Sequence, residues 1–119
     1  MIKDINILRP DPAIYKIGSE EVDLSFVPNG ITFEVDALLR EITKVMSFEG
    51  LNNNIEKQKE AFDLSIDLCV LFCSRKHPNL NKKYFDDECN AVQIRAIVDA
   101  IKLALNNSYK AVEKYGKNL

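Results

Sequence analysis

The chain has 119 residues, of which 46% are hydrophobic and 29% are charged, a composition typical of one globular domain. Sixteen basic and eighteen acidic side chains give a net charge of −2, which argues against nucleic-acid binding driven by bulk charge. The three cysteines are an odd number, which argues against a secreted disulfide scaffold, and the longest apolar run (residues 68–73) is far shorter than the ~20 residues that cross a bilayer. We therefore expect a cytoplasmic protein with neither a membrane nor a nucleic acid as its partner.

The N-terminal part of the chain is predicted to contain a β-hairpin. Residues 14–17 form a short, mainly apolar segment, Val22, Leu24 and Phe26 alternate with other residues over 22–27, and Gly18 lies in the polar turn between these two segments. An isolated hairpin is only marginally stable in water. We therefore expect this hairpin to pack against the helices that follow it.

Residues 31–35 fit two structures. Apolar and polar side chains alternate there, which is typical of a third strand and would give a three-stranded meander, followed by a helix that Asp36 caps. Alternatively, Thr32 is the N-cap and Phe33 already belongs to the helix. The alternation leads us to favour the short strand.

Three main helices are predicted from apolar side chains at helical spacing. The first continues to about Met46, and the second spans about Ile55 to Lys76. The pair His77-Pro78 ends the second helix, because the residue before a proline avoids the α conformation. The second half of this helix is apolar on nearly all sides, which is typical of a central helix or of one that covers a partner.

The last helix has the clearest signals at both ends. Asn90 is predicted as its N-cap with Gln93 completing a capping box, and Gly116 is predicted just beyond its C-terminal end. The loop of residues 79–90 is polar, with one helical turn expected at residues 82–85. A regular apolar stripe runs along the whole of the last helix.

Together these elements predict one domain over residues 1–119 with an α+β, mostly α fold. A hairpin region at residues 1–35 is expected to pack on a bundle of three main helices at residues 36–119. The first 68 residues carry an excess of acidic side chains and the rest an excess of basic ones. Either the two parts face each other within the fold, or the acidic face of one subunit meets the basic face of a neighbour.

Cys69, Cys73 and His77 recur at intervals of four residues, and Cys89 follows after a loop. Thiolates and imidazoles are zinc ligands, but two of these cysteines lie inside the most apolar predicted helix, where a buried cysteine behaves as a small apolar side chain. The sequence also has no Gly-rich phosphate-binding loop. We therefore predict no catalytic, cofactor-binding or metal-binding residues, and hence no enzyme.

The apolar stripes of the second and last helices are the predicted binding surface for a partner protein. Grooves between helices hold the apolar face of a partner helix through side chains at such spacing. The alternative is that both stripes form the core of one subunit. A second alternative is a homo-oligomer, because either edge of the hairpin can pair with a strand from a second copy. The predicted partner-binding residues are Leu64, Leu68, Leu71, Phe72, Ile97, Ile101 and Leu105.

Short motifs along the chain support a family resemblance. They are Tyr15-Lys16-Ile17-Gly18 and Val22-Asp23-Leu24 in the hairpin, Pro28-x-x-Ile31-Thr32, Val35-Asp36-x-Leu38-Leu39, and the helix break His77-Pro78-Asn79-Leu80. With the long last helix, this order of elements resembles the small tail assembly chaperones of long-tailed bacteriophages, over most of the chain. The hairpin departs from the purely helical picture of some members of that family.

The resemblance implies a non-enzymatic helical protein of phage or prophage origin. Such a protein coats the tape-measure protein and recruits tail-tube subunits in the cytoplasm of the bacterial host, and this chain would be the short form of the chaperone. The family has no catalytic signature, so no residue roles are carried over. The alternative function is that of a small virion structural protein, such as a head–tail connector or a tail-completion component.

Overall fold

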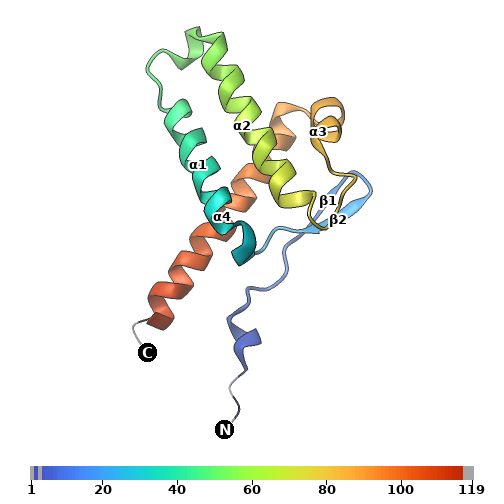
Figure 1. The fold of residues 1–119 in the computed structure, drawn as a ribbon, viewed down its shortest axis with the longest axis vertical. Helices are drawn as coiled ribbons and strands as arrows, with labels where there is room; N and C mark the ends of the chain where they lie inside the picture. Colours follow the sequence, from blue (N-terminus) through green and yellow to red (C-terminus); the bar gives the residue numbers. More distant parts are fainter. Residues whose placement is uncertain (1, 3, 117–119) are drawn as a thin grey trace.

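The computed structural model describes residues 2 and 4–116, with side chains described as far as residue 110. Figure 1 shows α1 and α2 side by side as an antiparallel pair, with α4 crossing behind them and the hairpin near the end of α2. The fold is thus α+β and mostly α, with a two-stranded N-terminal hairpin, as predicted. Its strands and helices are β1 (Ile14–Ile17), β2 (Glu20–Asp23), α1 (Thr32–Met46), α2 (Ile55–Cys73), α3 (Lys82–Glu88) and α4 (Ala91–Gly116).

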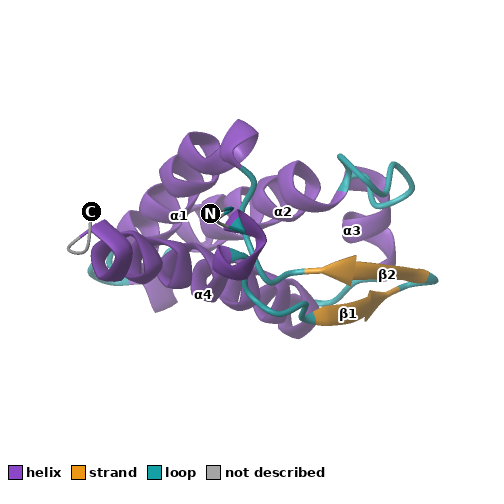
Figure 2. Ribbon diagram, turned by 90° about the horizontal axis from the view of Figure 1, so that it is seen from below, coloured by secondary structure: helices purple, strands orange, loops and turns teal. Residues whose placement is uncertain are grey.

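The turn of the hairpin requires glycine at its first position. β1 and β2 pair in antiparallel register, with Ile17 opposite Glu20 next to the turn. Gly18 has a φ of +61°, which side chains with a Cβ rarely adopt, and a Cβ there would lie 2.8 Å from Oη of Tyr84 on α3. The tip of the hairpin is therefore packed directly against α3 (Figure 2).

The segment predicted as a third strand instead begins α1, so that prediction is wrong. The helix starts at Thr32, and the residue before it, Ile31, is the N-cap. Ile31, Val35 and Leu39 are buried at a spacing of four residues, whereas Phe33 is 87% exposed. The alternating pattern counted Phe33 as a core residue, but the i, i+4 pattern of a helix accounts for the side chains that are buried.

Neither residue considered as the N-cap of this helix has that role. Thr32 is the first helical residue, and its hydroxyl donates to the carbonyl oxygen of Pro28 at 2.9 Å. Asp36 lies further inside α1, where one of its carboxylate oxygens is 2.7 Å from Nε of Arg40. The helical region therefore begins four residues before the predicted boundary at residue 36.

α2 ends at Cys73, three residues before the predicted end. The chain turns there, and the N–H of His77 donates to the carbonyl oxygen of Cys73 at 3.0 Å. The loop that follows contains a longer helix than predicted, because α3 covers Lys82–Glu88 and not a single turn. Asn81 caps α3, with its side-chain oxygen accepting from the N–H of Tyr84 at 2.9 Å.

The N-terminal capping box of α4 is confirmed. The N–H of Asn90 donates to Oε1 of Gln93 at 2.8 Å, and the N–H of Gln93 donates to Oδ1 of Asn90 at 3.0 Å. At its other end α4 includes Gly116, which was predicted just outside the helix. None of the helices within residues 2 and 4–116 combines the length and the apolar composition that crossing a bilayer requires.

One apolar core joins the hairpin to the helices. Ile17 and Val22 of the hairpin belong to the same buried cluster as side chains from all four helices. The hairpin region and the helical region therefore share their interior, as the marginal stability of an isolated hairpin led us to expect. The largest fully buried side chains are Phe85, Leu68, Leu80, Ile94 and Ile101.

We expect Leu68→Ala to lower the free energy of unfolding by about 2–5 kcal/mol, because it leaves a cavity at a fully buried position of α2. Leu64→Ala, on the same helix but at a half-buried position, is the matched control and should cost clearly less. Urea denaturation followed by circular dichroism measures both. Equal losses for the two variants would contradict the burial described here.

Gly18→Ala is expected to destabilise the protein by about 1–2 kcal/mol, because the new Cβ meets both an unfavourable φ and the ring of Tyr84. Ser19→Ala changes the neighbouring turn position, where φ is not positive, and should be close to neutral. Thermal melting of the two variants compares them. A neutral Gly18→Ala would show that the tip of the hairpin is not packed against α3.

Candidate functional site

The structure divides the seven predicted partner-binding residues into two groups. Four of them are buried inside the subunit, in the apolar core that α2 and α4 share with the other elements: Leu68, Ile97, Ile101 and Leu105. The other three are only partly buried and pack against the edge of the core: Leu64, Leu71 and Phe72. The two helices therefore do not form the open walls that the sequence predicted, and only the second group has atoms that a partner can reach.

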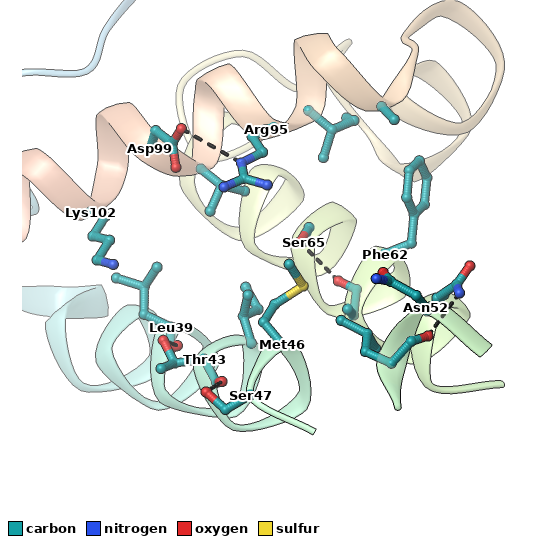
Figure 3. A pocket seen from close by; sticks show the side chains of 17 residues that line it. Leu39, Thr43, Met46, Ser47, Asn52, Phe62, Ser65, Arg95, Asp99 and Lys102 are labelled. Carbon is teal, nitrogen blue, oxygen red and sulfur yellow. Dashed lines mark hydrogen bonds and ion pairs between the residues drawn. The ribbon is translucent and has the colours of Figure 1, made fainter. Parts of the chain in front are cut away.

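An apolar groove lies elsewhere, between the C-terminal half of α1, the N-terminal half of α2 and the N-terminal half of α4. It encloses about 450 Å³. It forms because α1 packs closely along α2 but only lightly against α4. Figure 3 shows its lining, with Met46 on α1, Phe62 on α2 and the charged side chains along α4. The apolar side chains of the lining are Leu39, Ile42, Met46, Leu51, Ala61, Phe62, Ala91, Ile94 and Val98.

Two large apolar side chains in the lining, Met46 and Phe62, are exposed to solvent. Their side chains are 46% and 41% exposed, although both line the same cavity. Exposed apolar side chains that gather around a concave surface are typical of a binding site for another apolar group. Methionine adds adaptability, because its unbranched side chain adjusts to the shape of what it contacts.

The hydroxyl groups in the groove are already engaged by the protein itself. Thr43 donates to the carbonyl oxygen of Leu39 at 2.9 Å, and Ser47 donates to that of Thr43 at 2.8 Å. Ser65 donates to the carbonyl oxygen of Ala61 at 2.8 Å. These back-bonded hydroxyls present no free donor to the cavity. Nε2 of Gln58 donates to the carbonyl oxygen of Leu51 at 2.8 Å, and the exposed Asn52 also lines the groove, so the mainly apolar walls carry a few polar groups.

Charged side chains form the rim of the groove along α4. Nε of Arg95 lies 3.9 Å from a carboxylate oxygen of Asp99, and both side chains are mainly exposed, so this pair is weak. Lys102 lies one turn further along and is also exposed. With two cations and one anion, this rim favours a ligand that carries negative charge beside its apolar part.

No pattern in the sequence predicts this groove. Phe62 lies in the first half of α2 among charged neighbours, and Met46 is the last residue of α1. The available signal was the presence of large apolar side chains at positions that the helical patterns do not place in the core. Such positions predict that Met46 and Phe62 are exposed, but they do not show that α1, α2 and α4 bring these two side chains into one groove.

The cysteines and the histidine are not brought together as one set of ligands. Cys69 and Cys73 are buried free thiols, Cys89 is a half-buried free thiol, and burial raises the pKa of Cys73 to about 12. Nδ1 of His77 lies 3.0 Å from a carboxylate oxygen of Glu20 on β2. Within the part of the chain that the structure describes, no three His, Cys, Asp or Glu side chains are placed to hold a metal ion.

The thiols should therefore react with a maleimide or with iodoacetamide at different rates. Only the thiolate reacts, and burial raises the pKa of all three thiols. We expect Cys89 to be labelled first in the folded protein, faster at higher pH, and Cys69 and Cys73 only after denaturant is added. Peptide mass spectrometry identifies the labelled positions, and equal labelling of all three in the folded protein would contradict the burial of α2.

Comparisons of the chain with protein-family models, curated proteins and solved structures found no match.

Proposed function

We propose that this protein is a non-enzymatic tail assembly chaperone whose groove binds an apolar helical segment of the tape-measure protein. In this role it acts in the cytoplasm of the bacterial host and recruits tail-tube subunits. The observation that carries the proposal is the open apolar groove between α1, α2 and α4. The order of elements that resembles tail assembly chaperones supplies the identity of the partner.

The chemistry of the groove favours a polypeptide over a small molecule. Sites for small molecules fix their ligand with a few convergent polar groups, and the hydroxyls in this lining already bond to their own helices. An apolar helix face needs no such groups, because its own backbone hydrogen bonds are internal. The free energy of binding then comes from burying apolar surface on both partners.

The shape of the site agrees with helix-in-groove binding. Antiparallel α1 and α2 form one side, and α4 forms the other. A partner helix would insert side chains spaced at i, i+3, i+4 and i+7 along this length. The cations Arg95 and Lys102 on the rim favour acidic residues beside the apolar stripe of that helix.

We expect Phe62→Lys and Met46→Lys each to weaken binding of a purified helical tape-measure fragment by about tenfold or more, since each removes apolar contact and places a charge in the groove. The matched control is Phe33→Lys, which changes an exposed phenylalanine of α1 that does not line the groove. Isothermal titration calorimetry measures affinity, and circular dichroism checks that all variants fold.

The proposal fails if the groove variants bind as tightly as the original chain, or if the original chain binds no tape-measure fragment. Mass spectrometry of purified virions adds an independent check. An assembly chaperone leaves the finished particle, so its presence there in stoichiometric amount would favour the structural alternative, a connector or completion protein.

A further inference from the structure

We propose that the N-terminal arm of one copy, residues 4–8, occupies the groove of a second copy and holds it until the partner protein arrives. This inference rests on the proposed role of the groove as a protein-binding site, and it names what regulates that site. The arm is thus a placeholder supplied by the chain itself.

The arm presents apolar side chains without covering them. Residues Ile5–Leu8 form a short 3-10 turn, η1, in which Asp4 is the N-cap and accepts from the N–H of Asn6 at 2.9 Å. Ile5 and Ile7 are 77% and 74% exposed, and no residue of η1 is buried. Several aliphatic side chains gathered on one exposed turn are typical of an interaction segment.

The arm is separated from the core by a stiff connection. Pro10 and Pro12 restrict the backbone between η1 and β1. Arg9 stacks over the ring of Phe26, 4.1 Å from its centre, which anchors the base of the arm to the body. Beyond that contact, Figure 1 shows the arm running away from the helices, toward the opposite end of the molecule from the loop between α1 and α2.

This placement favours an occupant from a second copy over the arm of the same copy. The groove lies toward the α1–α2 loop, which includes Leu51 and Asn52 of its lining, and the arm projects from the other end. One copy thus offers an arm at one end and a groove toward the other. Such a head-to-tail contact is heterologous, because it uses a different surface on each of the two copies, and it joins successive copies.

The arm and the groove are complementary in both apolar surface and charge. Ile5, Ile7 and Leu8 are aliphatic, as are most of the side chains that line the cavity. Asp4 precedes them and is exposed, and the rim along α4 carries two cations, Arg95 and Lys102, with one anion, Asp99. Docking of η1 into the cavity can therefore place a carboxylate next to the cationic rim, which fixes the direction of the arm.

The small size of the arm makes it displaceable. A few aliphatic side chains bury far less area than a stable interface requires, so self-association should be weak and dependent on concentration. A longer partner helix that fills the same groove buries more surface and displaces the arm. When the arm occupies some of the grooves, the apparent affinity for the partner equals the intrinsic affinity multiplied by the fraction of grooves that are free.

The test measures self-association by sedimentation velocity from low to high micromolar concentration, without any partner present. We expect the original chain to shift from monomer toward larger species as concentration rises. The double variant Ile5→Asp/Ile7→Asp, which changes only exposed positions, and the groove variant Phe62→Lys should each remain monomeric. The matched control is Ile55→Asp, the same substitution at a 79% exposed position outside the groove, which should associate like the original chain.

A mixing experiment identifies the donor and the acceptor. The arm variant keeps an intact groove, and the groove variant keeps an intact arm. An equimolar mixture of the two should therefore form heterodimers, although neither associates alone. Docking of the arm within its own copy predicts no association in the mixture, and that result would overturn the proposal. Continued association of the arm variant alone, through another face, would overturn it as well.

Titration with the tape-measure fragment separates this inference from the proposed function. If both are correct, Ile5→Asp/Ile7→Asp binds the fragment at least as tightly as the original chain, because the placeholder is gone. If only the inference fails, the fragment binds through the groove while the original chain stays monomeric. If only the proposed function fails, no variant binds the fragment while self-association still depends on the arm and the groove.

Discussion

The apolar C-terminal half of α2 is covered along most of its surface, and the rest of the structure is arranged to do this. Leu68, Cys69 and Cys73 are almost completely buried there. α1, α3 and α4 all contact α2, and the hairpin contributes to the same core. The N-terminal half of α2 is mainly polar and needs less cover, so α1 and α4 diverge beside it and leave the groove. The position of the core therefore follows from the apolar half of α2, and the position of the groove follows from its polar half.

Helical periodicity was sufficient to predict the main elements. The long apolar stripe of α4 and its Asn90–Gln93 capping box were correct because both depend on side chains that lie within a few residues of each other. The same reasoning failed at the start of α1. A stretch of five residues fits both an alternating and a helical pattern, and only the burial of Val35 together with the exposure of Phe33 distinguishes them. Which of these side chains is buried depends on tertiary packing, which the local sequence does not show.

The candidate site was harder to predict from the sequence, because its position also depends on tertiary packing. An apolar stripe shows that a helix face is buried, but it does not show whether the same chain or a partner buries it. Leu68 and Ile101 are covered by the subunit itself, whereas Met46 and Phe62 are not. The interpretation of Cys69 and Cys73 as buried core side chains is confirmed. Their spacing does not show that α2 ends at Cys73, or that the imidazole of His77 pairs with Glu20 of the hairpin.

The hydroxyls that bond back to their own helices have a consequence for evolution. Because Thr43, Ser47 and Ser65 bond to their own helices, these hydroxyls impose no hydrogen-bonding pattern on the proposed partner segment. The proposed partner segment would then need only its apolar spacing and its charge beside the rim, and Met46 can adjust its side chain to the shape of the segment. Such a pair would tolerate many changes of sequence on both sides of the contact.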